Sequence, residues 1–452
     1  MATVHSAPTQ IDTLALERVL CDLGRVPRLA DLGHNGPLLA SAGVNSLFHC
    51  LFGRDSIRMA MDLLDDFPAV ARATILELAR LQGLIDNPRA EEEPGRIIHE
   101  HRAPDDPQAL RLSETGWDFP YFGAVDTTPQ WINLLGAYCA RHGSGLLDET
   151  LHNRSWAIVT VRDSLLAALV WVVRRLDDAR GGGFVWVRRA SPNGIPNQVW
   201  EDSCDSYYHA DGRLLDSSLP WAPVAVQGYA FDALLAAADL LEAAPGPLPI
   251  DPTLLRQRAL TLRQKVLRDF WLPDLGTFAQ ALTVDADGRL EPARVVASSA
   301  GHLLNSRLLD GADTAPYRIR LIKRLTASDL VCGAGIRTKS TLAPRFRAGA
   351  YHNGSSWPMD TGVIAEGLRR HGAQRAADDL ERRILDSCQK LSGFPEFFRG
   401  EIEGPVRINT EIVDAVVDGQ LNRLEQPPQA NQGWTATRVW RILHKHPLRH
   451  PA

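Results

Sequence analysis

The sequence predicts an all-α fold, an (α/α)6 barrel in which six helical hairpins form a toroid, with short β-hairpins inserted in the active-site loops. Three observations support this prediction. Apolar residues recur with a helical period through most of the 452 residues, and strand-like alternation is sparse. In addition, loops of unusual composition alternate with plain connectors, as in a ring of helix pairs where every second connection lies on one face.

The helical stretches are marked by apolar stripes and, in several cases, by start and stop signals. Asp55 precedes the first stretch, Pro129 and Pro358 stand at the starts of two others, and Gly83 and Gly143 close two more. The predicted helices cover 56–67, 69–83, 128–142, 160–178, 222–243, 253–270, 296–309, 316–328, 358–371, 374–391 and 433–445. Short hairpin pieces are predicted at 184–187 and 277–284.

Special loops fall at 50–55, 93–128, 197–212, 296–302, 335–358, 393–400 and 426–434, whereas 245–252 and 372–373 are ordinary polar connectors. No linker or low-complexity tract divides the chain. We therefore predict an N-terminal lead-in arm over 1–45 and a single catalytic domain over 46–452.

Composition limits the function classes. The formal net charge of −5 offers no attraction for phosphate backbones or anionic lipids, and no secretory signal or membrane-spanning apolar run is seen, so we expect neither a nucleic-acid nor a membrane partner. Six cysteines are scattered without a CxxC pair, which indicates reduced thiols, a cytoplasmic location and no metal site. Eleven tryptophans are compatible with sugar binding, although tryptophan is equally a core residue.

The segment 197–206 gives the strongest chemical signal. Glu201, Asp202 and Asp205 place three acids within five residues, directly after Trp200. Mutual repulsion and partial burial would raise at least one pKa, as a general acid near neutral pH requires. A solvated acidic loop or an aspartate-capped helix start would show the same pattern.

Three further segments carry candidate site residues. Glu396 stands alone between proline and two phenylalanines, where either burial tunes its carboxylate or, as this segment alone favours, the glutamate points to solvent while the phenylalanines pack. Arg54 and Asp55 are either a helix cap with its own ion pair or a clamp for vicinal sugar hydroxyls. The segment 351–360 combines His352, Asn353 and Trp357 in one loop entering a helix, a pattern typical of polar ligand contacts but also of a loop that bonds to itself.

Other catalytic patterns are missing from the sequence: there is no GxxxxGK[ST] phosphate loop, no HExxH or HxxxH pattern and no GxSxG elbow. His99, Glu100 and His101 resemble a cluster of metal ligands. Adjacent positions of an extended loop point to opposite sides, so we do not expect the three side chains to share a metal ion. No cofactor is expected.

An ordered series of motifs resembles the amylo-α-1,6-glucosidase domain of glycogen-debranching-type enzymes. FGRDS at 52–56 matches that family's signature, EPGRIIHE at 93–100 is similar to EPGKILHE, and YFGAVDTTP at 121–129 is similar to YYGSVDATP. The acidic segment followed by VQGY, then GIRT, YHNGSSWP, the P-E-x-F segment and the late P-Q…W follow in the same order, from about 40 to 445. The resemblance implies an (α/α)6 barrel, shared with glucoamylase-like, trehalase-like and mannosylglycerate or glucosylglycerate hydrolases, and inverting hydrolysis.

The resemblance also assigns roles. Asp205 is the implied proton donor, with Asp202 and Glu201 as rivals, and Glu396 is the implied base that activates water. Arg54 and Asp55 would grip the terminal sugar. The remaining implied pocket residues are Trp117, Tyr121, Asp126, Trp200, His352, Asn353, Trp357 and Trp434.

The expected activity is exo-acting, inverting removal of one sugar, expected to be glucose, from an α-glycoside such as an α-1,6 branch or a small soluble glucoside. Inversion needs the two carboxyl groups about 6.5–9.5 Å apart. Glu201 replaces the motif's usual lysine and the late segment departs from C-S-P-Q-A-W, so glycogen branches and small glucosides stay equally open as substrates. The alternatives are a sugar isomerase or epimerase working through histidines, and a carbohydrate-binding or scaffold protein without turnover.

Overall fold

The computed structural model describes residues 11–43, 46–177, 182–243, 250–284, 287–401, 411–417, 420–426 and 428–444, and helices dominate it. The α-helices are α1 (Thr13–Gly24), α2 (Gly53–Leu63), α3 (Pro68–Arg80), α4 (Pro107–Glu114), α5 (Thr127–His142), α6 (Val161–Asp177), α7 (Val224–Ala243), α8 (Pro252–Asp269), α9 (His302–Asn305), α10 (Ala315–Leu325), α11 (Pro358–Arg370), α12 (Gln374–Leu391) and α13 (Gly433–Leu443). The fold is therefore helix-rich, as predicted.

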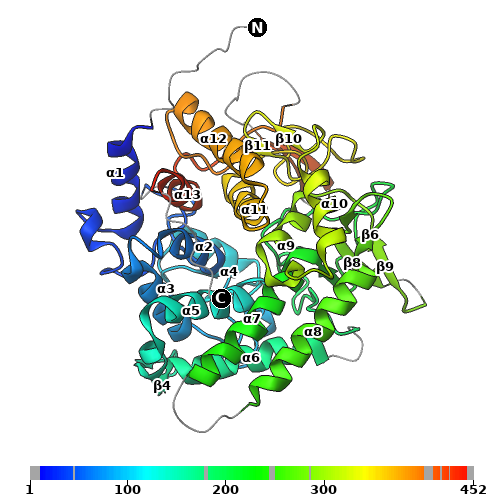
Figure 1. Cartoon of the computed structure of the whole chain (residues 1–452). Coiled ribbons are helices and arrows are strands. Elements are labelled where there is room, and N and C mark those ends of the chain that lie inside the picture. Colours follow the sequence, from blue (N-terminus) through cyan, green and yellow to red (C-terminus); the bar gives the residue numbers. More distant parts are fainter. Residues whose placement is uncertain are drawn as a thin grey trace.

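These helices form two layers. In the inner layer α2 contacts α5, α5 contacts α7, α7 contacts α9, α9 contacts α11 and α11 contacts α13. The last helix of this series, α13, also packs against the first, α2. Figure 1 shows α1, α3, α6, α8, α10 and α12 outside this inner series. Inner and outer helices alternate along the chain.

A buried ionic cluster joins the two ends of the inner layer. Arg438 of α13 pairs with Asp62 of α2 at 2.6 Å and with Glu366 of α11 at 2.5 Å. All three side chains are at most 12% exposed. Since removal of one partner would leave a buried charge unpaired, this cluster holds α2, α11 and α13 in one arrangement.

The alternation of loops is confirmed. The connections from an outer to the next inner helix are long: 25–52, 81–126, 178–223, 270–301, 326–357 and 392–432. Connections in the other direction are mostly short, as at 64–67 and 371–373. Nearly every residue singled out in the sequence lies in a long connection or in the first turn of the helix that follows it.

The sheets are small. The described strands pair as β1 (Leu51–Phe52) with β2 (Glu100–His101), β3 (Thr150–His152) with β4 (Ile158–Thr160), β5 (Trp221–Pro223) with β8 (Ala281–Val284) and β8 with β9 (Leu290–Ala293), β6 (Trp271–Leu272) with β7 (Thr277–Phe278), β10 (Val331–Cys332) with β11 (Gly335–Ile336), and β12 (Glu411–Val417) with β13 (Gln420–Gln426). The hairpin predicted at 277–284 is split between β7 and β8. At 184–187 only Val187 forms a bridge, with Trp221.

Three helical segments differ from the sequence prediction. Helix α4 forms inside the predicted loop 93–128, where Asp106 caps its start by accepting the Gln108 and Ala109 N–H groups. The stretch 296–309 is not one helix, because Ser306 takes an extended backbone and its hydroxyl accepts the Leu308 N–H, which starts a separate 3-10 turn. In the region predicted as a lead-in arm, α1 is a regular helix that begins with Asp12 accepting the Ala15 N–H and packs against α13. The domain boundary at 45 remains a prediction.

Among the described residues, α7 alone is long and apolar enough to meet the length and composition criteria for a membrane span, with a mean hydropathy of 1.4. However, 78% of this apolar stretch of α7 is buried inside the protein, where α7 packs against α5, α8 and α9. Its apolar character is explained by this central position in the core.

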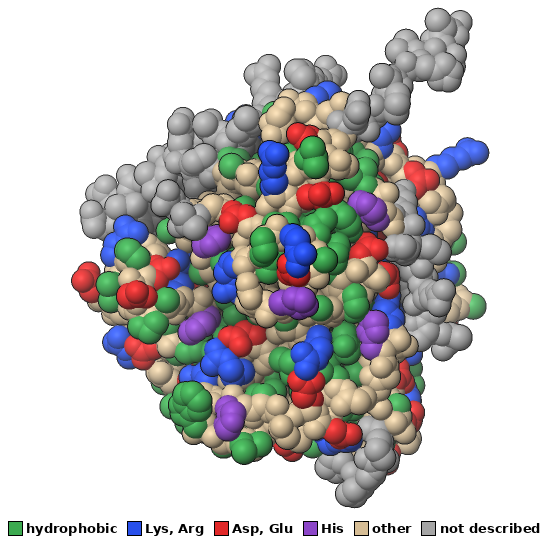
Figure 2. Space-filling model, turned by 90° about the vertical axis from the view of Figure 1, so that its left-hand side faces the viewer, with side chains coloured by type: hydrophobic (Ala, Val, Ile, Leu, Met, Phe, Trp, Pro, Cys, Tyr) green, Lys and Arg blue, Asp and Glu red, His purple; other side chains and the backbone are tan. Residues whose placement is uncertain are grey.

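Charges are mixed on the face shown in Figure 2, where lysine and arginine side chains alternate with aspartate and glutamate. This face carries no broad surface of a single sign, which agrees with the balanced composition of the chain.

Candidate active site

The acidic segment 197–206 is a tightly bonded turn in the long connection between α6 and α7. The Asn197 side-chain amide donates to the Ser203 carbonyl at 2.7 Å and to the Ser206 hydroxyl at 3.0 Å. Ser206 in turn donates to the carbonyl of Glu201 at 2.6 Å. Because both ends of the turn are fixed, neighbouring acids in it can face different surroundings.

Asp202 faces the first turn of α2. Its Oδ2 lies 3.4 Å from Nη2 of Arg54, and its side chain keeps 30% of its surface exposed. Burial raises the pKa of Asp202 to about 6, Arg54 opposes this rise, and the nearby carboxylate of Asp126 adds to it. Asp202 is thus a reachable carboxyl group that holds its proton closer to neutral pH than an ordinary aspartate does.

Glu201 points elsewhere, since its fully buried carboxylate pairs with Lys339 Nζ and accepts the Tyr207 hydroxyl at 3.0 Å. With both oxygens engaged by the protein, Glu201 is in poor position to donate a proton to a substrate.

Asp205 lies in a third environment. Its Oδ2 is 3.8 Å from Nη2 of both Arg345 and Arg347, and only 8% of its side chain is exposed. The side-chain amide of Asn353 donates to its carbonyl at 3.0 Å. Asp205 therefore joins the acidic turn to the loop before α11.

Glu396 approaches from the connection between α12 and α13. Its buried carboxylate accepts the Tyr351 hydroxyl at 2.7 Å and the Gln429 N–H at 3.2 Å. Burial raises the pKa of Glu396 to about 7; these two hydrogen bonds oppose the rise, and the charges of Asp55 and Asp202 reinforce it. Glu396, Asp55 and Asp202 thus act on one another electrostatically, which places them around one site.

Arg54 and Asp55 are presented by the start of α2. Gly53 makes this possible, because a Cβ there would lie 2.1 Å from the carbonyl oxygen of Ile98. Arg54 is buried and its Nη1 lies 3.4 Å from Asp126. Asp55 accepts the side-chain amide of Gln432 at 3.1 Å, and burial raises the pKa of Asp55 to about 7.

Aromatic rings form a wall next to the acidic turn, which His352 contacts through Ser203. The Trp357 ring stacks with His352 at 4.9 Å and contacts Trp434 edge-on at 5.6 Å. Trp200 contacts Trp357 at 5.9 Å and His352 at 5.5 Å, both edge-on. Flat apolar rings beside carboxylates are a common environment for a sugar, whose C–H faces pack on the rings while its hydroxyls bond to the polar groups.

Several polar atoms of this wall are buried without a hydrogen-bond partner in the described part of the chain: Nε1 of Trp200, Nε1 of Trp434 and Nε2 of His352. The Ser203 N–H donates to Nδ1 of His352 at 3.3 Å, and burial with the charges of Lys339 and Arg54 keeps the pKa of His352 well below its usual range. His352 is therefore neutral with its proton on Nε2. All three atoms are donors that hydroxyl oxygens of a ligand can satisfy.

Trp117 and Tyr121 form a separate pair whose rings stack at 4.0 Å. The Tyr121 hydroxyl accepts the Ile195 N–H at 2.9 Å, and Nε1 of Trp117 donates to the carbonyl of Asn193 at 2.8 Å. Both rings thus support the segment that leads into the acidic turn.

The structure also adds site residues that the sequence did not single out. Tyr351 is the first residue of YHNGSSWP, Lys339 directly follows GIRT and Gln432 lies in the late segment 426–434, which is the signal that could have found them, whereas Arg345 and Arg347 belong to no quoted motif. Among the described residues, no group of three or more His, Cys, Asp or Glu side chains is arranged to hold a metal ion.

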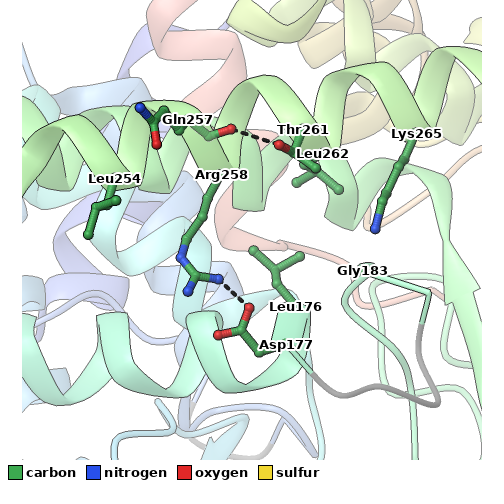
Figure 3. Close-up of a pocket in the computed structure, with 9 residues that line it drawn as sticks. All are labelled: Leu176, Asp177, Gly183, Leu254, Gln257, Arg258, Thr261, Leu262 and Lys265. Atoms are coloured by element: carbon green, nitrogen blue, oxygen red, sulfur yellow. Dashed lines mark hydrogen bonds and ion pairs between the residues drawn. The ribbon is translucent and has the colours of Figure 1, made fainter.

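A hollow on the outer surface lies apart from this site. It is formed by α6, α8 and Gly183 (Figure 3). Arg258 pairs there with Asp177, and Lys265 donates to the carbonyl of Gly182 at 2.8 Å. Its charged groups serve the packing of α8 on α6.

Comparison with known proteins gives a consistent result. Residues 141–401 match the family model described as the mannosylglycerate hydrolase MGH1-like glycoside hydrolase domain. The GH63 mannosylglycerate hydrolase from Thermus thermophilus in complex with Tris is similar with a TM-score of 0.61 at 14% identity, over 97% of this chain and 100% of that one. The same hydrolase in complex with glucose gives a TM-score of 0.58 at 15% identity, over 92% and 98%. No curated protein sequence matches significantly. The structural likeness shows a shared fold.

Proposed function

The chain belongs to the mannosylglycerate hydrolase MGH1-like glycoside hydrolases, and we propose that it is an inverting, exo-acting enzyme that releases one sugar from a small α-glycoside. The predicted resemblance is thus correct at the level of a glycoside hydrolase, while the matching family is not specifically that of the debranching amylo-α-1,6-glucosidases. The inner series of helices, in which α13 returns to α2, supports an (α/α)6 barrel as the scaffold.

The observation that carries this proposal is the placement of Asp202 and Glu396 on two connections that both reach the first turn of α2. Asp202 lies 3.4 Å from Arg54, and Gln432, from the connection of Glu396, donates to Asp55 at 3.1 Å. The two carboxyl groups come from different loops and each has a raised pKa. The charge of Asp202 contributes to the rise in the pKa of Glu396. An inverting glycosidase needs one protonated and one ionised carboxyl group, on opposite sides of the scissile bond.

We assign the proton donor to Asp202. It is the most exposed of the three acids in the turn and faces Arg54, whereas Glu201 is bonded to Lys339. Asp205 is the donor that the family resemblance implies, and its position beside Arg345 and Arg347 gives it a binding role in this proposal.

The mechanism follows from these positions. Asp202 donates its proton to the glycosidic oxygen as the bond to the sugar carbon breaks. Glu396 removes a proton from a water molecule that attacks the opposite face of the sugar. The Tyr351 hydroxyl and the Gln429 N–H stabilise the ionised form of Glu396 that this step requires. These steps need no cofactor.

We propose glucose or mannose as the sugar and a carboxylate-bearing group such as glycerate as the leaving group. Arg345 and Arg347 lie at the acidic turn, 3.8 Å from Asp205, where guanidinium groups can bind a carboxylate. The Thermus thermophilus relative is a mannosylglycerate hydrolase that has been crystallised with Tris and D-glycerate. The six cysteines all lie in the described part of the chain and form no disulfide there, and we propose a cytoplasmic location.

A panel of mannosylglycerate, glucosylglycerate, glucosylglycerol, trehalose, isomaltose and glycogen limit dextrin tests the substrate. Glucosylglycerol is the matched control, because it has the same sugar as glucosylglycerate but no carboxylate. We expect faster turnover of the glycerates and release of the β-anomer, observed by proton NMR. Preference for limit dextrin would instead favour branch cleavage, and release of the α-anomer would exclude inversion.

Two aspartate variants test the donor. Asp202→Asn should lower kcat on the natural glycoside by about 10²–10⁴-fold. The same variant should retain most activity on the α-glycosyl fluoride, whose leaving group needs no proton. Glu396→Gln should lose both activities. If Asp205→Asn shows the pattern expected of Asp202→Asn, the donor is Asp205.

A further inference from the structure

A buried ion pair next to the proposed proton donor joins two long loops of the site. Glu201 precedes Asp202 directly, and its carboxylate pairs with Lys339, which lies 138 residues later in the chain. Both side chains have no exposed surface. The pair joins the connection between α6 and α7 to the one between α10 and α11.

Further contacts hold this pair in one geometry. The Tyr207 hydroxyl donates to the second oxygen of Glu201, and Lys339 Nζ lies 5.8 Å from the centre of the Tyr207 ring. On the other side, the backbone of the lysine loop is fixed by a bridge between Lys339 and Ala297. The side chain of Glu201 is therefore held at both oxygens, and its backbone cannot rotate without breaking a buried bond.

The neighbours of Glu201 in the chain are Trp200 and Asp202, one in the aromatic wall and the other facing Arg54. A rotation of the backbone at Glu201 would move both at once. An ion pair that only stabilised the fold would not need to include the residue between Trp200 and Asp202. In addition, buried ion pairs contribute little to stability compared with apolar groups of equal volume.

We infer that Glu201 and Lys339 are positioning residues that hold the carboxyl group of Asp202 in place for proton transfer. This inference rests on the proposed function, in which Asp202 is the donor. The pair is electrically neutral as a whole, so its removal should change the position of Asp202 rather than its charge environment. That environment consists of Arg54, Asp55, Asp126 and Glu396, which face Asp202 from α2, the start of α5 and the loop before α13.

The decisive variant replaces both members by methionine, Glu201→Met with Lys339→Met. Single replacements leave one buried charge unpaired and can fail to fold, whereas apolar pairs of similar volume are often tolerated. We expect the double variant to keep a melting temperature near that of the wild type and a similar KM. Its kcat should fall at least about tenfold, because a displacement of about 1 Å can lower the rate up to about 100-fold.

The pH profile separates positioning from electrostatics. If the pair positions Asp202, kcat should fall equally at every pH while both limbs of the profile stay within about half a pH unit. A shift of the alkaline limb without loss of kcat at the optimum would show an electrostatic role and overturn the inference. Lys339→Arg, which keeps the charge, should recover most of the lost rate.

The matched control is the pair Arg369–Glu381, which joins α11 and α12 away from the acidic turn with Glu381 only 5% exposed. Replacing both of its members by methionine should leave kcat unchanged. If this control loses as much kcat as the Glu201–Lys339 variant, the loss reflects a general effect of removing a buried ion pair, and the inference would be wrong.

A crystal structure of the methionine double variant keeps this test independent of turnover. We expect the carboxyl group of Asp202 to leave its position 3.4 Å from Arg54. An unmoved Asp202 overturns the inference whatever the activity. Failure of the proposed function has a different signature, namely a wild-type protein that releases no sugar from any glycoside, or an Asp202→Asn variant that retains full activity.

Discussion

The hydrogen bond from Tyr351 to Glu396 offers a direct test of the proposed base. The Tyr351 hydroxyl donates to Oε1 of Glu396 over 2.7 Å, and it favours the ionised carboxylate. Tyr351→Phe removes this donor and leaves the Gln429 N–H on the other oxygen. The variant should raise the pKa of Glu396 above about 7, where burial places it in the intact site.

The size of the shift follows from the strength of the bond. A hydrogen bond to a charged group contributes about 1.5–3 kcal/mol, and one pKa unit corresponds to about 1.4 kcal/mol. The pKa of Glu396 should therefore rise by at least about one unit. If the base must be ionised, the active fraction at pH 6 should fall about tenfold, whereas at pH 8 it should fall only about twofold.

The assay is the pH dependence of kcat/KM between pH 5 and 9, with the substrate that the glycoside panel identifies. In Tyr351→Phe the ratio of kcat/KM at pH 6 to kcat/KM at pH 8 should fall about fivefold. The matched control is Tyr207→Phe, which removes a hydroxyl bonded to the other buried glutamate, Glu201, at 3.0 Å. The control can lose rate through the position of Asp202, but its ratio of activities at pH 6 and pH 8 should not change. An unchanged ratio of activities at pH 6 and pH 8 in Tyr351→Phe would refute the assignment of Glu396 as the base.

Three other predictions follow from the same site. Glu396→Gln should stabilise the protein at pH 8 but hardly at pH 5. The pKa of Glu396 is raised from 4.5 to about 7, so the native state loses up to about 3 kcal/mol of stability as pH rises through this window. Thermal unfolding at both pH values measures the difference. Arg54→Gln should raise kcat/KM at pH 8 relative to kcat/KM at pH 6, because Arg54 lowers the pKa of Asp202, and an unchanged ratio would contradict their pairing. Trp434→Phe should lower kcat/KM about tenfold if the indole N–H donates to a sugar hydroxyl. Titration calorimetry with 1-deoxynojirimycin and 1-deoxymannojirimycin should show an equal loss in binding affinity.

Much of the fold could be read from the sequence because helix formation and loop composition are local properties. The predicted helix over 128–142 differs from α5 by one residue, and 374–391 is identical to α12. The break at Ser306 was not predictable from periodicity, since apolar residues continue on both sides of it. It depends on one hydroxyl that caps the next turn.

The candidate site was predictable as a set of residues but not as an arrangement. The motifs drew attention to Arg54 at the start of α2, to the acidic turn and to Glu396, which come from separate parts of the chain. The sequence could not separate Glu201 from Asp202, because the partner that removes Glu201 from consideration is Lys339, 138 residues away. Pairings over such distances leave no trace in local spacing.

The role of the segment 93–100 illustrates the same point. It matched the family pattern without a residue of evident chemistry. In the structure Arg96 is fully buried and donates to the side-chain oxygen of Gln198 at 2.8 Å, at the base of the acidic turn. The carbonyl of Gln198 also accepts the Val125 N–H at 2.8 Å. This motif thus anchors the turn that carries the acids, a function that becomes visible only when the partner is known.

The electrostatics of the site explain how two similar carboxyl groups can take different roles. Asp202 and Glu396 have pKa values raised to about 6 and about 7, and the charge of Asp202 contributes to the rise at Glu396. At a pH between these two values, the free protein holds the proton on Glu396 and leaves Asp202 ionised, the reverse of what the mechanism needs. Arg54 lies beside Asp202 and favours its ionised form, whereas the Tyr351 hydroxyl favours the ionised form of Glu396. With opposing groups of this kind, the contacts of a bound glycoside decide where the proton resides: a glycosidic oxygen next to Asp202 favours the proton there and leaves Glu396 free to accept one from water.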